Sequence, residues 1–160
     1  MAMTLDGKIA KNSEHFPDWT SREDKKLFAE ISKSHGVVLM GEKTFATFPA
    51  PLKDRLNVVF TLNENSPEIP GVKWMTGDVK KALEELEKLG YASVLLGGGA
   101  YLNSLFLKKK LIDEIIVTIE PKIFGSGISL FSGEYDVDLE LLEMKKINKN
   151  TLMLRYRVKY

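Results

Sequence analysis

The stretch Val37-Val38-Leu39-Met40-Gly41-Glu42-Lys43-Thr44-Phe45 decides how the middle of the chain folds. Four apolar residues in a row predict a buried strand over residues 37–40. The glycine that follows predicts a turn, and Thr44 brings a hydroxyl to the helix start expected after it. Such a strand-to-helix turn can bind an anion, because the backbone N–H groups at a helix start have no partner within the helix. A turn with a purely structural role is the commoner alternative.

A second turn of this kind, Leu96-Gly97-Gly98-Gly99, follows a strand predicted over residues 93–96 and precedes a helix. Three residues without side chains let a phosphate approach the backbone and the start of that helix. The spacing matches neither the Rossmann fingerprint nor the P-loop. A tight structural turn usually needs only one glycine, so the triple glycine favours phosphate binding.

Outward from these two turns, short apolar runs alternate with helical patterns. Further strands are expected over residues 57–61, 72–75 and 114–119, and helices over 21–33, 78–89 and 99–110. The last third alternates polar and apolar residues over 138–144 and 151–158, around Asn148-Lys149-Asn150, which is typical of an antiparallel hairpin. The sequence therefore predicts one α/β domain over residues 1–160, with a mixed and mainly parallel sheet.

Composition excludes several classes of function. The chain of 160 residues has 23 Lys and Arg against 22 Asp and Glu, so its net charge is +1. This leaves no large field to attract nucleic acid or an anionic membrane. With no cysteine and only His15 and His35 as imidazoles, the chain cannot carry a thiolate nucleophile, a disulfide framework or a Cys/His zinc site.

The sequence also allows predictions of cellular location and of assembly. No apolar run reaches the ~18 residues of a membrane span, and the first residues lack a signal-peptide pattern, so we expect a soluble cytoplasmic protein. The many Lys and Glu residues without cysteine are compatible with a thermophilic source. An apolar edge strand over residues 139–144 makes a homodimer plausible.

Two charged residues are candidates for a site. Asp24 lies three and four residues before Leu27 and Phe28, on the apolar stripe of its predicted helix. Either it is a buried functional carboxylate, or it closes a capping box by reaching back to the Ser21 N–H group. Arg55 could bind a carboxylate bidentately, although such a residue is more often a solvated surface charge.

Taken together, these motifs resemble the dihydrofolate reductase superfamily over almost the whole chain. Residues 38–45, Pro51-Leu52, residues 55–61 and the triple glycine resemble its cofactor turns and the strand between them. The spacing from Trp19 to Asp24 to Phe28, and Val117-Thr118-Ile119, also match family motifs. The resemblance implies a three-layer fold with helices on both faces of the sheet.

The resemblance also implies a function, the transfer of hydride from NADPH, with NADH possible, to a pterin, most simply 7,8-dihydrofolate. Asp24 would be the active-site acid, supported by Thr118 and Trp19. The substrate would contact Phe28, Phe48, Leu52, Arg55 and Leu96. The cofactor would contact Gly41, Glu42, Lys43, Thr44, Thr61, Leu62, Asn63, Gly97, Gly98, Gly99, Ala100 and Tyr101. Residues 5–19 would form a mobile loop over the site.

A second branch of the superfamily, the pyrimidine reductase of riboflavin biosynthesis, resembles residues 3–8, 21–24 and 117–125. That reading implies a ribosylaminopyrimidine as substrate. Two residues favour folate: Leu96 stands where riboflavin-pathway reductases usually have Glu, and Arg55 matches the arginine that binds the folate tail. A nucleotide- or pterin-binding module without turnover is a third interpretation, and it would need no carboxylate in the pocket.

Two departures from the family pattern affect the expectations. Met1 to Thr4 supply only the last residues of the family's first strand. Glu42 and Leu62 stand where relatives present arginine to the 2′-phosphate of NADPH, and Lys43 could compensate. We therefore expect NADPH to be used with weak discrimination against NADH.

Overall fold

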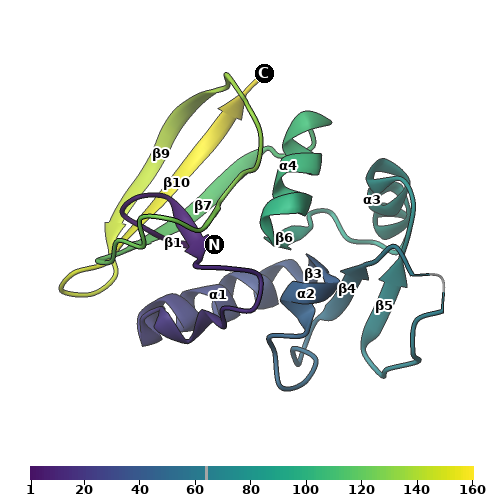
Figure 1. Ribbon diagram of the computed structural model, residues 1–160. Coiled ribbons are helices and arrows are strands. Elements are labelled where there is room, and N and C mark those ends of the chain that lie inside the picture. Colours follow the sequence, from purple (N-terminus) through teal and green to yellow (C-terminus); the bar gives the residue numbers. More distant parts are fainter. Residues whose placement is uncertain (64) are drawn as a thin grey trace.

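The computed structural model describes residues 1–63 and 65–160 and is shown in Figure 1. Its strands are β1 (Ala2–Thr4), β2 (Lys8–Ala10), β3 (Val37–Gly41), β4 (Leu56–Phe60), β5 (Val72–Met75), β6 (Leu95–Gly98), β7 (Glu114–Glu120), β8 (Ile128–Ser129), β9 (Asp138–Lys146) and β10 (Leu152–Lys159). Its helices are α1 (Arg22–His35), α2 (Glu42–Phe45), α3 (Val79–Lys88) and α4 (Ala100–Lys108), with a 3-10 turn at Pro17–Trp19. The predicted α/β alternation and the C-terminal hairpin are confirmed.

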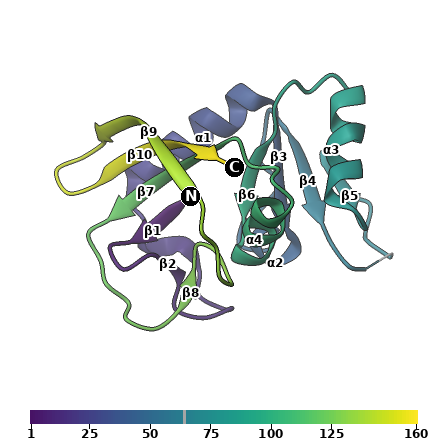
Figure 2. The same ribbon diagram turned by 90° about the horizontal axis from the view of Figure 1, so that it is seen from above.

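The mixed sheet is built as two four-stranded sheets, which Figure 2 shows side by side. One has the order β5-β4-β3-β6 and is parallel throughout; the other has the order β1-β7-β10-β9, with β1 parallel to β7 and the rest antiparallel. The ladder between β3 and β6 shifts register at Leu39/Met40, where β6 runs into its glycines. At this junction the Met1 side chain packs on Gly98.

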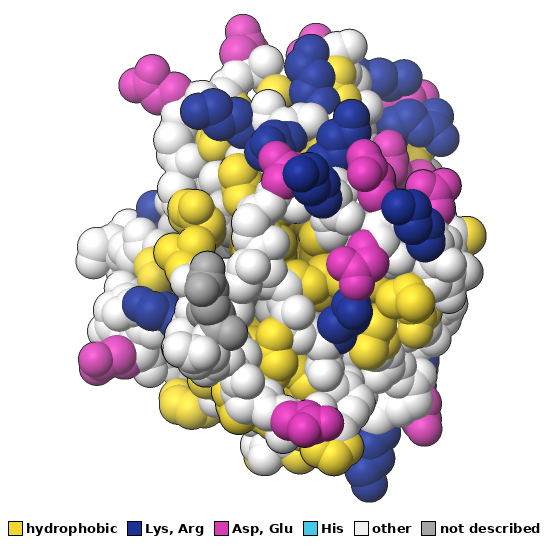
Figure 3. Space-filling view, turned by 90° about the vertical axis from the view of Figure 1, so that its right-hand side faces the viewer, with side chains coloured by type: hydrophobic (Ala, Val, Ile, Leu, Met, Phe, Trp, Pro, Cys, Tyr) yellow, Lys and Arg dark blue, Asp and Glu magenta, His cyan; other side chains and the backbone are white. Residues whose placement is uncertain are grey.

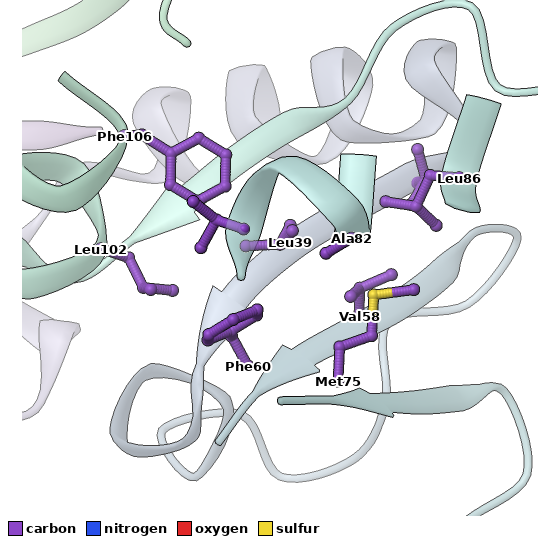
Figure 4. Close-up of a cluster of buried hydrophobic side chains, with 10 residues drawn as sticks. Leu39, Val58, Phe60, Met75, Ala82, Leu86, Leu102 and Phe106 are labelled. Carbon is purple, nitrogen blue, oxygen red and sulfur yellow. The ribbon is translucent and has the colours of Figure 1, made fainter. Parts of the chain in front are cut away.

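The parallel sheet contains the main core. Leu39 and Val58 are fully buried and contact residues of α3 and α4, as Figure 4 shows. Side chains alternate between the faces of a strand, so Val38 and Val59 point to the opposite face, where α1 packs on β3. Helices therefore cover both faces of this sheet, as predicted, and both faces of its central strands are apolar.

Two predicted segments differ from the structure. The strand expected over 93–96 is β6, which begins two residues later and extends through Gly97 and Gly98, because neighbouring β3 continues to pair with it. The segment expected to be a loop over residues 5–19 contains β2 and the 3-10 turn. Strand β2 pairs with β8, a partner more than a hundred residues away that local sequence does not reveal.

The surface carries charges of both signs. On the face shown in Figure 3, basic and acidic side chains are interspersed. Lys73 pairs with Glu85 at 2.8 Å and Lys109 with Asp78 at 3.0 Å. Within the described residues, no helix combines the length and apolarity needed to cross a bilayer.

Candidate active site

A cavity of about 1410 Å³ opens where the two sheets meet. Its lining comes from α1, the segment 9–20, both glycine turns and the end of β4. Of the predicted site residues, seventeen line it: Trp19, Asp24, Phe28, Gly41, Glu42, Lys43, Thr44, Phe48, Leu52, Arg55, Thr61, Leu62, Asn63, Gly97, Gly99, Ala100 and Tyr101. Residues far apart in sequence are thus brought to one site by the fold.

The other three predicted residues lie beside the cavity. Leu96 packs against the core cluster, and Gly98 lies under the Met1 side chain. Thr118 is 2% exposed on β7, opposite Ala2 of β1. Their assigned roles remain predictions.

The capping of α1 decides between the two interpretations of Asp24. The Ser21 hydroxyl accepts a hydrogen bond from the Asp24 N–H group at 3.2 Å, as a cap should. The reciprocal bond of a capping box is not made by Asp24, however, because the Ser21 N–H group donates to Glu120 Oε1 at 2.7 Å. The Asp24 carboxylate is therefore available to the cavity that it lines.

Glu120 is a residue that the sequence interpretation missed. It is 3% exposed at the end of β7, and its second oxygen accepts from the Thr151 hydroxyl at 3.0 Å. A buried carboxylate is stable only where hydrogen bonds replace its water, and these two bonds supply that replacement. The sequence did contain one indication of this role, an acidic residue at the end of a strand that is otherwise mostly apolar.

Aromatic side chains form the wall next to Asp24. Phe28 and Phe48 lie nearly parallel, with ring centroids 6.1 Å apart and an interplanar angle of 13°. Leu52 completes this wall, and its loop is held by Asn57, which accepts from the Leu52 N–H group and donates to its carbonyl, both at 2.9 Å. The wall suits a flat, apolar ligand.

Trp19 lines the cavity from the segment before α1. Its ring meets that of Phe124 edge to face, with centroids 5.1 Å apart. Its indole Nε1 is buried and has no hydrogen-bond partner among the described residues. Because a buried donor without a partner is costly, this N–H group is suited to a ligand or a water molecule in the cavity.

Arg55 is fixed at the opposite end of the aromatic wall. Its Nε donates to the Lys53 carbonyl at 2.9 Å, and its Nη1 donates to the Ala29 carbonyl at 3.3 Å and to the Ser32 hydroxyl. Burial lowers its pKa, and the charge of Asp54 opposes that shift. The guanidinium nevertheless stays protonated, because arginine does not lose its proton in proteins. No described residue accepts a hydrogen bond from its Nη2. The charge is thus held in place with one edge unpaired.

The two glycine turns meet on the other side of the cavity. A Cβ on Gly99 would lie 3.4 Å from the Thr44 hydroxyl, and one on Gly97 would lie 3.2 Å from the Val38 side chain. Helix α4 begins at Gly99 with no side-chain cap, so the N–H groups of its first turn are open to a ligand. The peptide bond between Gly98 and Gly99 is cis. A cofactor phosphate could approach the uncapped N–H groups of this turn without meeting a glycine side chain.

Next to these turns, Glu42 is held by a neighbouring strand. The Thr61 hydroxyl donates to Glu42 Oε2 at 2.9 Å and accepts from the Asn63 N–H group at 3.0 Å. Leu62, 87% exposed, and Lys43 lie on the same rim. The rim therefore presents a fixed carboxylate beside a flexible cation.

Among the other lining residues, Lys25 and His15 were not predicted as site residues. Lys25 follows Asp24 on α1, and His15 lies in the segment before it. His15 Nδ1 accepts from the Lys11 N–H group at 3.1 Å, which leaves Nε2 to carry the proton of the neutral ring. His15 falls in the segment 5–19 that was predicted to cover the site, whereas no pattern in the sequence indicated Lys25.

The model of the RibD C-terminal domain family matches residues 1–153. The chain belongs to this family. It is also 32% identical, over 107 residues, to dihydrofolate reductase of Staphylococcus aureus, an alignment that covers 67% of this chain and 62% of that protein. The predicted resemblance to the dihydrofolate reductase superfamily is confirmed, and named relatives include oxidoreductases of both branches.

Solved structures of both branches share the fold. RibD of Acinetobacter baumannii has a TM-score of 0.87 at 20% identity, over 100% of this chain and 57% of that one. Dihydrofolate reductase of Enterococcus faecalis, solved with NADP(H), has a TM-score of 0.75 at 20% identity, over 99% and 94%.

Proposed function

We propose that this chain is an NADPH-dependent reductase that reduces a pterin, 7,8-dihydrofolate, to its tetrahydro form. The observation that carries the proposal is the Asp24 carboxylate, which Glu120 leaves free to face the cavity. A module that only binds a nucleotide has no need of that costly arrangement. The neighbouring aromatic wall and Arg55 add a flat binding surface and a cation to the same cavity.

The glycine turns are suited to the cofactor. Gly97, Gly99 and the first turn of α4 would hold its phosphates by backbone N–H groups, and Thr44 faces the same point. NADPH, when bound there, supplies the hydride. NADH is the second candidate, because the rim next to the turns carries Glu42. The structure of the enterococcal dihydrofolate reductase, solved with NADP(H), supports this assignment.

On the substrate side, Asp24 would accept hydrogen bonds from the amino-pyrimidine edge of the pterin. As the carbon next to N5 receives hydride, N5 must take a proton, and Asp24 would favour that protonation through its charge. Phe28 and Leu52 would hold the ring against the wall. The unpaired Trp19 N–H group would bind the pterin or a water molecule beside it.

Arg55 would bind the carboxylate of the folate tail. The two bonds to α1 fix its guanidinium, so little conformational entropy is lost when the free Nη2 edge meets an anion. Asp24 and Ala29, the residue beside which Arg55 is held, are five positions apart on α1, a rise of roughly 7.5 Å. A carboxylate end and a cation end at this separation suit a ligand with a polar ring at one end and an anionic tail at the other.

A second candidate substrate is the ribosylaminopyrimidine of riboflavin biosynthesis. The family model favours it, and the A. baumannii RibD shares the fold. In that case Arg55 would meet the phosphate of the substrate, and Lys25 on the same cavity wall would assist it.

The decisive experiment follows NADPH oxidation with each substrate in turn. Turnover with dihydrofolate at a kcat/KM at least ~10²-fold above that with the ribosylaminopyrimidine supports the proposal, and the reverse ratio overturns it in favour of the second candidate. Cofactor binding without turnover of either substrate would overturn the assignment as an enzyme.

A further inference from the structure

The turn between β9 and β10 is linked to the start of α1 in two ways. Asn148, within the turn, donates from its side-chain amide to Glu23 Oε2 at 3.2 Å, and Glu23 lies in the first turn of α1. Thr151, which immediately precedes β10, is 1% exposed, and its hydroxyl donates to Glu120 Oε2 at 3.0 Å. The C-terminal hairpin is thus connected to the helical turn that carries Asp24.

Hydrogen bonds within the turn hold Thr151 in place. The Ile147 N–H group donates to the Thr151 carbonyl at 3.0 Å, and the Asn150 N–H group donates to Asn148 Oδ1 at 2.8 Å. A β-branched side chain such as that of threonine also has few rotamers open to it. The Thr151 hydroxyl is therefore presented to Glu120 from a rigid support.

Three hydrogen bonds connect Thr151 to Asp24. The Thr151 hydroxyl donates to one oxygen of Glu120, and the Ser21 N–H group donates to the other at 2.7 Å. The Ser21 hydroxyl then accepts from the Asp24 N–H group at 3.2 Å. Because Glu120 is 3% exposed and has a donor on each oxygen, both the place and the rotation of its carboxylate are fixed.

Without Glu120, the Ser21 N–H group would have a second acceptor close by. Asp24 is three residues after Ser21, the position from which an acidic side chain reaches back to the N–H group of the capping residue. A carboxylate that makes this bond turns toward its own helix and away from a ligand in the cavity.

We propose that Thr151 and Glu120 are positioning residues of the reductase. By binding the Ser21 N–H group, Glu120 leaves Asp24 nothing to gain from closing its own cap, and Thr151 holds Glu120 in the rotation that this requires. The inference rests on the proposed role of Asp24 in the reaction, and it makes the C-terminal hairpin a support of the active site.

Glu120→Met and Glu120→Gln form a matched pair for the test. Methionine has a similar length and no strong acceptor, so it frees the Ser21 N–H group without leaving a buried charge. The kcat for dihydrofolate should fall at least ~10-fold because Asp24 is misplaced, whereas the KM for NADPH should stay within about twofold. Glutamine offers its amide oxygen to Ser21 and its NH₂ group to the Thr151 hydroxyl, which accepts as well as donates, so kcat should stay within about threefold.

Thr151→Val and Thr151→Ser test the other end of the chain of hydrogen bonds. Valine has nearly the shape of threonine but no hydroxyl, so one oxygen of Glu120 loses its donor and the carboxylate is free to rotate away from Ser21. The kcat for dihydrofolate should fall at least ~3-fold. Serine keeps the hydroxyl and should restore the rate of the wild type.

The pH dependence of kcat separates positioning from a mere loss of stability. An Asp24 carboxylate that accepts a further hydrogen bond from Ser21 has a different balance between its charged and neutral forms, so the profile of Glu120→Met should differ from that of the wild type. The profile of Glu120→Gln should not. An unchanged kcat and profile in both Glu120→Met and Thr151→Val would overturn the proposal, and so would equal losses in Glu120→Met and Glu120→Gln, which would assign the effect to charge.

A measurement on the free protein tells this proposal apart from the proposed function. The ¹³C resonance of the Asp24 carboxyl carbon, recorded without substrate, should move in Glu120→Met and stay in place in Glu120→Gln. If dihydrofolate is not turned over but this resonance moves, the substrate assignment fails and the positioning of Asp24 stands. A resonance that is the same in all three proteins would overturn the positioning role whatever the substrate.

Discussion

The two four-stranded sheets of this protein differ in burial and in what they contribute to the cavity. In the parallel sheet β5-β4-β3-β6, the central strands β4 and β3 are buried on both faces. Strand β3 and the edge strand β6 each end in a glycine turn. In the sheet β1-β7-β10-β9, burial declines outward until every residue of β9 is exposed. The parallel sheet supplies the two glycine turns at the cavity. The mixed sheet supplies Glu120, which accepts a hydrogen bond from the Ser21 N–H group before α1, and an open edge. The free energy of unfolding and the binding of the cofactor should therefore depend mainly on the parallel sheet.

The largest effect is expected from Asp24→Asn. Because it removes the one carboxylate that α1 directs at the cavity, turnover of dihydrofolate should fall by about 10² to 10⁴, the usual scale of acid–base catalysis. The fall should be smaller with an already protonated substrate. Glu23→Gln, on the neighbouring position and outside the cavity lining, is the matched control. An unchanged rate at neutral pH would remove Asp24 from the mechanism.

The contrast in burial predicts a contrast in stability. Leu39→Ala, in the fully buried β3, should lower the free energy of unfolding by roughly 2 to 5 kcal/mol, because it leaves a cavity in the main core. Leu139→Ala, 47% exposed on β9, should change it by less than about 0.5 kcal/mol. Both should be measured by urea unfolding. Equal losses would show that the open edge is part of the core.

Arg55→Ala tests the substrate end of the cavity. Loss of one charged hydrogen bond should raise the KM for dihydrofolate by an amount worth roughly 1.5 to 3 kcal/mol. A pterin without the glutamate tail should hardly be affected, which controls for any disturbance of α1 through Ala29 and Ser32. If both substrates lose equally, Arg55 has a structural role and the ribosylaminopyrimidine gains support.

Glu42→Arg tests whether Glu42, next to the glycine turns of the parallel sheet, sets the preference between NADPH and NADH. The Glu42 carboxylate repels a 2′-phosphate and can accept a hydrogen bond from a free 2′-hydroxyl, so wild-type preference for NADPH should stay below ~10²-fold, under about 3 kcal/mol. Arginine should increase that preference. Catalytic efficiency and dissociation constants for both cofactors measure it. A wild-type preference above a thousandfold, or no gain with arginine, would show that Glu42 does not face the 2′ position.

The smallest effect concerns pH. A hydrogen bond from the Thr4 hydroxyl, with further bonds from the Gly125 and Phe124 N–H groups, lowers the pKa of Asp6. A lowered pKa in the folded state stabilises the protein above the unfolded pKa, and this contribution is lost as the pH falls through the folded value. Asp6→Asn should therefore lower the melting temperature slightly at pH 7 and by less at a pH below the unfolded value of 3.8. An equal decrease at both pH values would contradict the assignment to ionisation.

The sequence alone predicted the helices, most strands and the two glycine turns. It also predicted twenty candidate site residues, and seventeen of these line the cavity. Apolar periodicity and turn chemistry act over a few residues, so they can be recognised without a structure. The tertiary structure alone decided that Asp24 faces the cavity, since its competitor for the Ser21 N–H group is Glu120, 99 residues from Ser21 along the chain. It also decided the division of the strands into separate sheets and the bonds that fix Arg55 to α1. Each of these depends on which distant segments become neighbours, and that is settled by packing of the whole chain rather than by local pattern.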